Sequence, residues 1–123
     1  MKKIIYIIVV LLVVAGIAYV ITTPGKSGKY DNLAQCIKDS GATFYGAFWC
    51  PHCQAQKAEF GKSAKLLPYV ECSTPDGQGQ LQVCKDAGVT SYPTWKFANS
   101  TTTLTGEIPL ADLAEKTGCK LPN

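Results

Sequence analysis

The sequence predicts an α/β domain, a small mixed sheet with helices on both faces, preceded by one transmembrane helix. Three observations support this prediction. An apolar segment follows the first three residues, strand-like and helix-like stretches alternate through the rest of the chain, and a Cys-x-x-Cys pair stands between one such strand and the next helix. A length of 123 residues allows one domain and a short extra segment.

The apolar segment runs from Ile4 to Ile21 without a charged residue. As a helix it would span about 27 Å, close to the hydrocarbon core of about 30 Å. We therefore expect a cytoplasmic N-terminus at residues 1–3, a transmembrane anchor at 4–23 and a breaker-rich linker at 24–30. The alternative is a cleaved signal peptide ending near Ala18. Both alternatives place the domain at 31–123 outside the cytoplasm.

The cysteines and the charges narrow the compartment and the partners. Six cysteines in one small exported domain fit an oxidising compartment, either the periplasm or, in a photosynthetic source, the thylakoid lumen. The net charge is +3, and all 12 basic residues are lysines. They form no cluster and include no arginine for bidentate base contacts, which argues against nucleic-acid binding.

The predicted elements alternate between helices and strands. In chain order they are a helix at 31–39 capped by Asp31 or Asn32, a strand at 42–48, a helix at 50–67, a strand at 69–72, a loop at 73–79, a helix at 80–87, a strand at 94–98, a turn at Asn99-Ser100, a strand at 101–105 and a helix at 110–117. Alternation implies crossover connections and parallel pairing, whereas the last two strands form a hairpin.

The motif Cys50-Pro51-His52-Cys53 stands at the start of the predicted helix at 50–67. Unpaired N–H groups and the positive end of the helix dipole favour the thiolate of Cys50, so we predict that Cys50 attacks and Cys53 resolves. Pro51 suits a first helical position. His52, as a cation or an N–H donor, would stabilise the thiolate and make the disulfide a stronger oxidant, unless it is a solvated loop residue.

A Cys-x-x-Cys pair can also hold a soft metal ion such as Cu(I) or Zn(II). Tetrahedral zinc needs four ligands, and the sequence contains no second pair of this kind. We therefore predict neither a metal nor a bound cofactor. A non-catalytic copper-binding module remains an alternative.

The four other cysteines allow three pairings. Cys72 and Cys84 flank a turn-rich loop and a short helix, so we predict a disulfide between them, which stabilises the fold by roughly 3 kcal/mol in the chain-entropy picture. Cys36 and Cys119 then form a second disulfide joining the ends of the domain, remain free, or pair with another protein.

The Cys-Pro-His-Cys motif together with Tyr92-Pro93-Thr94 resembles the thioredoxin fold, and its Pro-His dipeptide matches that of DsbA-type oxidases. More closely, three separated segments in the same order resemble the thioredoxin-like domain linked to bacterial vitamin K epoxide reductase homologues. These segments are residues 45–53, 67–72 and 92–95, and the resemblance extends over about 32–118.

The resemblance implies that Pro93 is a cis proline facing the active-site disulfide, so that a substrate peptide can pair beside Tyr92. An ordinary trans turn proline is the alternative. Trp49 would belong to an apolar docking patch at the reactive sulfur, or to the core. Phe44 departs from the family, because thioredoxins and DsbA proteins usually have a buried carboxylate there, and the proton route to Cys53 stays unassigned.

Together these inferences predict a membrane-anchored thiol–disulfide oxidoreductase that oxidises dithiols of exported proteins and acts as a monomer. By resemblance, a separate quinone-linked membrane partner of vitamin K epoxide reductase type would reoxidise it. The alternative within enzymes is an extracytoplasmic thiol reductase for a dedicated maturation pathway, such as cytochrome c assembly.

Overall fold

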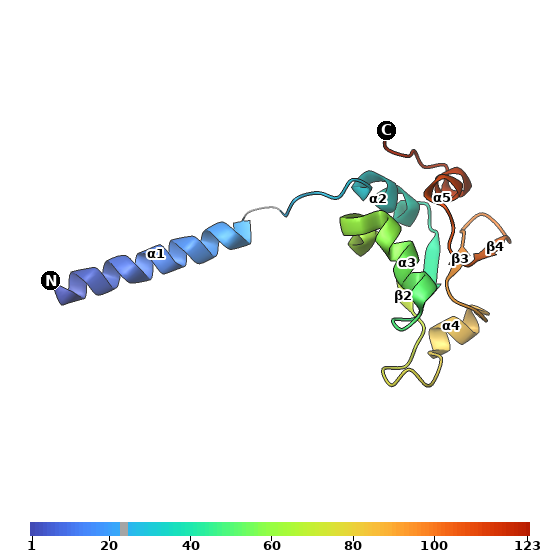
Figure 1. Cartoon of the computed structure of the whole chain (residues 1–123), viewed down its shortest axis with the longest axis horizontal. Coiled ribbons are helices and arrows are strands. Elements are labelled where there is room, and N and C mark those ends of the chain that lie inside the picture. The colour runs from blue at the N-terminus through green and yellow to red at the C-terminus, as the bar shows by residue number, and fades with distance from the viewer. Residues whose placement is uncertain (23–24) are drawn as a thin grey trace.

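The computed structural model describes residues 1–22 and 25–123. Thr23 and Pro24, at the predicted junction of anchor and linker, lie outside the described residues. The first helix, α1 (Lys2–Thr22), is exposed along its whole length and reaches a mean hydropathy of 3.1. Figure 1 shows it apart from the folded domain. By length and composition α1 can cross a membrane, a property that a signal sequence shares.

The centre of the domain is a four-stranded sheet with the order β2-β1-β3-β4. Its strands are β1 (Thr43–Gly46), β2 (Tyr69–Glu71), β3 (Thr94–Lys96) and β4 (Thr103–Thr105). The pairing of β1 with β2 is parallel, and the pairings of β3 with β1 and with β4 are antiparallel. The predicted mixed sheet is confirmed, with the strand at 42–48 in a central position.

The pairing of β3 with β1 corrects the expectation of parallel crossovers. A parallel return normally needs a helix that carries the chain back along the sheet. The helix between β2 and β3, α4 (Gln82–Asp86), has five residues, too few to carry the chain that far. The chain therefore enters β3 from the opposite end of the sheet.

Helices lie on both faces of the sheet, as predicted, but unequally. Successive residues of a strand point to opposite faces, so Phe44 and Tyr45 of β1 mark the two sides. Phe44 stacks on Trp95 at 4.6 Å and belongs to the main core with residues of α2 (Asp31–Asp39), α3 (Pro51–Phe60) and α5 (Leu110–Thr117). Tyr45 packs against a smaller cluster around Cys72, Cys84 and Val89, where α4 lies.

The predicted helix at 50–67 is two elements. The α-helix ends at Phe60, and a 3-10 segment, η1 (Gly61–Leu66), continues the chain. Gly61 has a φ of 55°, a left-handed conformation that glycine adopts without a steric penalty and that breaks the α-helical path. The prediction of one long helix therefore missed a break at this glycine.

The start of α2 and the last hairpin also differ in detail from the predictions. Asp31 is the first helical residue and no side chain caps the helix, because the Asp31 carboxylate instead accepts a hydrogen bond from the Gly28 N–H at 2.9 Å. The hairpin between β3 and β4 is present, but its connection spans 97–102 rather than a two-residue turn.

Two disulfides tie the domain together. Cys36 of α2 is bonded to Cys119, just after α5, across 83 residues, and Cys72 after β2 is bonded to Cys84 of α4 across 12 residues. Figure 1 shows α2 and α5 side by side at the end of the domain where the chain terminates. The Cys36–Cys119 disulfide therefore joins the first and last helices of the folded domain, α2 and α5. The Cys72–Cys84 disulfide closes the loop beside the second cluster.

Candidate active site

The Cys50 side chain lies at the junction between β1 and α3. Cys50 is the N-cap of α3, with extended backbone angles, and its sulfur accepts a hydrogen bond from the Cys53 N–H at 3.4 Å. Pro51 occupies the first turn of the helix, where its missing N–H costs no hydrogen bond. The Cys53 N–H and the positive end of the α3 dipole therefore face the Cys50 sulfur.

Cys53 lies one helical turn deeper. Its side chain is 1% exposed, compared with 4% for Cys50, and both thiols are free in the structure. Burial, followed by the hydrogen bond with Cys50, raises the pKa of Cys53 to about 12. The pair is thus a reduced dithiol whose second member stays protonated at neutral pH.

The segment that contains Tyr92 and Pro93 faces the start of α3. The Tyr92–Pro93 peptide bond is cis, and the Tyr92 carbonyl oxygen lies 3.7 Å from the Cys50 sulfur. Gln80 holds the Tyr92 ring by donating a hydrogen bond to its hydroxyl at 2.8 Å. The structure therefore brings together Cys50, Cys53, Tyr92 and Pro93, which are far apart in the sequence.

Trp49 and Phe48 form an apolar rim beside the dithiol. They are 49% and 50% exposed, so Trp49 belongs to the surface rather than to the core. The Trp49 indole N–H donates to the Ser73 hydroxyl at 2.9 Å, and its ring makes an edge contact with Tyr92. Gly77 of the loop closed by the Cys72–Cys84 disulfide lies against the same indole. The loop and Tyr92 thus fix the orientation of an exposed apolar side chain next to the reactive sulfur.

His52 makes a contact that the sequence did not reveal. Its Nδ1 lies 2.7 Å from a carboxylate oxygen of Glu107, and both side chains are substantially exposed. Glu107 comes from the segment between β4 and α5, which Gln56 ties to α3 through hydrogen bonds with the backbone of Ile108. No local pattern around Glu107 marks it, because its role depends on this tertiary contact.

A second group missed by the sequence lies behind Cys53. The ammonium of Lys57 lies 3.3 Å from the centroid of the Tyr69 ring, and the Tyr69 hydroxyl donates to Glu71 at 2.8 Å. The spacing of four residues between Cys53 and Lys57 was the available signal, since such residues share one side of a helix.

The part of the chain that the structure describes contains no group of three or more His, Cys, Asp or Glu side chains placed to hold a metal ion. A thiol at the positive end of a helix beside an exposed apolar rim, with a second thiol buried one turn deeper, is instead the arrangement of a dithiol that exchanges with disulfides. The fold and the site therefore define a protein of the thiol–disulfide exchange class.

Comparison with known proteins agrees with this class. The thioredoxin family matches residues 28–117, and the chain belongs to that family. Thiol-disulfide oxidoreductase LTO1 of Arabidopsis thaliana is 48% identical over 94 residues, which is 72% of this chain and 24% of that protein. Human protein disulfide-isomerase A2 is 43% identical over 58 residues, 44% of this chain and 11% of that protein. The chain thus spans about a quarter of the first relative's length and about a tenth of the second's.

Proposed function

We propose that this protein is a membrane-anchored thiol–disulfide oxidoreductase that works outside the cytoplasm on dithiols of exported proteins. One observation supports the chemistry above all others. The Cys50 sulfur lies at the start of α3, 3.7 Å from the Tyr92 carbonyl oxygen, and Cys53 is buried one turn further along the helix. Both cysteines are buried, but Cys50 lies beside the exposed Trp49 whereas Cys53 lies one helical turn deeper, so a substrate would meet the Cys50 sulfur first, as a mixed-disulfide mechanism requires.

In the proposed direction the Cys50–Cys53 disulfide is the oxidant. A substrate thiolate attacks the Cys50 sulfur, the bond to Cys53 breaks, and the second substrate thiol then displaces Cys50. The substrate leaves as a disulfide and the protein as a dithiol. Cys50 leaves easily because the helix start favours its thiolate, and His52 in the motif would add to that effect. Trp49, Tyr92 and Pro93 would receive the substrate peptide.

The anchor and the partner are supported by separate features. The exposed apolar helix α1 is long enough to span a bilayer, and two disulfides suit an oxidising compartment such as the periplasm or the thylakoid lumen. The reduced dithiol must pass its electrons on after each turnover. We assign this step to a separate quinone-linked membrane protein of vitamin K epoxide reductase type, on the resemblance of the three sequence segments.

Trapping of mixed disulfides tests the proposal. A full-length Cys53→Ala variant keeps the attacking thiol but lacks the Cys53 thiol that resolves a mixed disulfide from within the protein, so we expect it to accumulate covalent complexes that a reductant dissolves. Mass spectrometry of these complexes would identify exported substrates and the membrane partner. The matched control is the Cys50→Ala/Cys53→Ala double variant. The proposal fails if both variants give the same set of complexes.

The direction of transfer requires a second measurement. A reductase for a dedicated maturation pathway is the competing function, because the fold alone allows both directions. Equilibration of the Cys50–Cys53 pair with glutathione gives its reduction potential. We expect a value closer to the DsbA level of about −120 mV than to the thioredoxin level of about −270 mV. A value at the thioredoxin level would favour the reductase.

A further inference from the structure

If the protein works as proposed above, the buried Cys53 must gain and lose a proton in each turnover. The position beneath the motif where a carboxylate would serve is Phe44, fully buried and stacked on Trp95 with the rings 7° from parallel. Phe44 can neither give nor accept a proton. When the Cys50–Cys53 bond breaks, the electron pair that stays on Cys53 would leave a thiolate in a site that burial makes unfavourable for charge.

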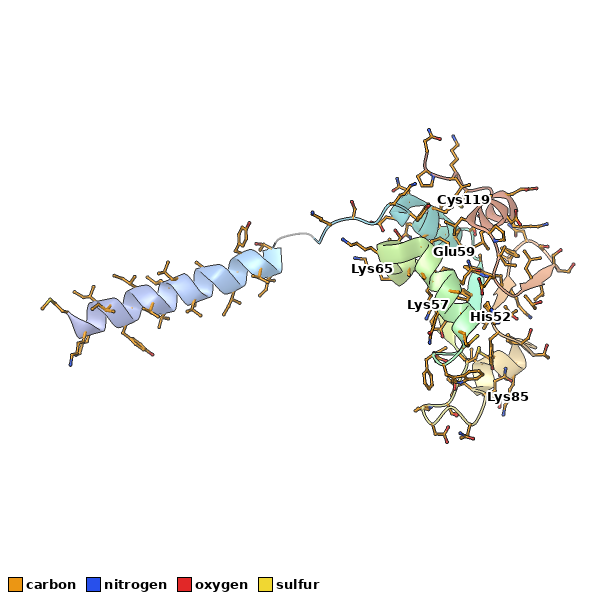
Figure 2. The ribbon with its side chains drawn as sticks, in the orientation of Figure 1. His52, Lys57, Glu59, Lys65, Lys85 and Cys119 are labelled. Atoms are coloured by element: carbon orange, nitrogen blue, oxygen red, sulfur yellow. A yellow bond between two sulfur atoms is a disulfide. The ribbon has the colours of Figure 1, made fainter. Side chains whose placement is uncertain are left out.

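Lys57 is the cation placed to stabilise and protonate this thiolate. It follows Cys53 by four residues on α3, a spacing that places both side chains on the same side of the helix. Figure 2 shows Lys57 on α3. Lys57 is half-buried, whereas Lys62 and Lys65 of η1 are exposed. Its positive charge acts on the thiol directly, lowering the pKa of Cys53 against the larger effect of burial.

Tyr69 holds the Lys57 ammonium in this place. The ammonium lies over the face of the ring, a cation–π contact with a centroid distance of 3.3 Å. The same ring reaches Cys53, because a Cβ added to Gly46 would lie 2.8 Å from Cε2 of Tyr69 and 3.0 Å from the Cys53 sulfur. Gly46 leaves this space open, so the sulfur and the ring that holds the ammonium meet at one point of β1.

Glu71 fixes Tyr69 in turn. One Glu71 oxygen accepts the Tyr69 hydroxyl proton at 2.8 Å, and the other accepts the Phe48 N–H at 3.2 Å and the Ser73 N–H at 2.9 Å. Burial and the Glu71 carboxylate raise the pKa of Tyr69, so the ring remains a neutral phenol at working pH. The ionisable groups that face Lys57 and Cys53 are thus Cys50 on α3 and Tyr69 and Glu71 on β2.

We propose that Lys57 is the proton donor and acceptor for Cys53, and that Tyr69 and Glu71 are its positioning residues. In the oxidising direction a substrate thiolate bonds to the Cys50 sulfur, and the Cys50–Cys53 bond breaks with its electron pair on Cys53. The Lys57 ammonium gives a proton to that sulfur, becomes a neutral amine and regains a proton from water. In the reverse direction the amine takes the proton from Cys53 before Cys53 attacks.

The test is the rate at which dithiothreitol reduces the oxidised full-length chain in detergent, followed by tryptophan fluorescence between pH 6 and 9. We expect Lys57→Met to slow the reduction by about 100-fold at pH 7, the lower end of general acid–base effects. Lys65→Met, which removes an exposed lysine, should match the wild type. Lys57→Arg keeps the charge but cannot release a proton. It should therefore have the wild-type reduction potential but neither the wild-type rate nor its pH profile.

A second pair of variants separates positioning from folding. Tyr69→Phe keeps the ring face but loses the hydrogen bond to Glu71, so its rate should lie between those of the wild type and Tyr69→Leu, which removes the cation–π contact and should approach Lys57→Met. The inference is overturned if Lys57→Met reduces as fast as Lys65→Met, or if Lys57→Arg regains the full rate. These outcomes leave the trapping by Cys53→Ala untouched, so this inference and the proposed function can fail separately.

Discussion

The two thiols of the active-site pair lie three residues apart and are both buried, but their surroundings differ. The Cys50 sulfur lies close to the surface, between the start of α3, the Tyr92 carbonyl and the half-exposed Trp49. The Cys53 side is an interior, closed by β1 and bordered by Tyr69. One α-helical turn is thus enough to separate the sulfur that meets the substrate from the sulfur whose protonation the protein controls.

This difference shows where the two halves of the chemistry are controlled. Recognition and attack depend on what surrounds Cys50, and loops supply those groups: residues 48–49 before α3, the loop closed by the Cys72–Cys84 disulfide, and the segment at 91–93. Proton control depends on what surrounds Cys53, and regular elements supply it from α3, β1 and β2. Loops can vary without disturbing the core, whereas the group behind Cys53 is part of the packing.

The largest expected effect comes from removing each of the two thiols separately. Cys50→Ser should abolish catalysed reduction of a disulfide peptide by dithiothreitol, down to the rate without protein, because Cys53 lies beneath the surface. Cys53→Ser should keep stoichiometric reaction of one thiol with a disulfide reagent while losing turnover. A Cys50→Ser variant with turnover above background would show that substrate reaches Cys53 and would remove the contrast between the two sides.

The next effect is on the packing behind Cys53. Gly46→Ala inserts a methyl group against both the Tyr69 ring and the Cys53 sulfur, and such overpacking typically costs about 1–3 kcal/mol of folding stability. Urea unfolding of the reduced protein would measure it. Gly25→Ala is the control, because nothing lies within 4 Å of the added carbon there. Equal stability of the two variants would mean that the Cys53 side is not closely packed.

The same contrast explains which parts could be predicted from the sequence. Local signals identified Cys50, Pro51 and the helix start, and the apolar runs identified the central strand and the final helix at 110–117. Contacts between distant segments could not be read in this way: Glu107 reaches His52 across 55 residues, and Tyr69 reaches Lys57 from a strand. The break at Gly61 and the antiparallel entry of β3 also depend on backbone geometry that residue types only hint at.

The buried thiol should make stability depend on pH in the reduced protein. The folded pKa of Cys53, about 12, lies above its ordinary value of 9.0, so the folded state holds the proton more tightly than the unfolded state. This contribution is complete below pH 9 and is lost as the pH rises toward 12, with a maximal slope of about 1.4 kcal/mol per pH unit. Unfolding of reduced wild type and Cys53→Ser from pH 7 to 10 would reveal it.

Both proteins in that experiment keep Cys50, so their difference isolates Cys53. The wild type should lose stability relative to Cys53→Ser above pH 9 and run parallel to it below. Parallel curves over the whole range would indicate that Cys53 ionises as freely in the folded state as in the unfolded chain.

The smallest expected effect is on the exposed side, at the contact between His52 and Glu107. Exposed pairs contribute at most about 1 kcal/mol, which corresponds to roughly 20 mV for a two-electron couple. Glu107→Gln removes a negative charge near the motif and frees His52 to act on the Cys50 thiolate, so both changes stabilise the reduced form. We therefore expect a potential more positive by up to about 20 mV in glutathione equilibration. The control is Glu115→Gln, which changes an exposed carboxylate of α5 and should leave the potential unchanged. A more negative potential for Glu107→Gln would mean that Glu107 helps His52 to stabilise the Cys50 thiolate and does not draw His52 away from it.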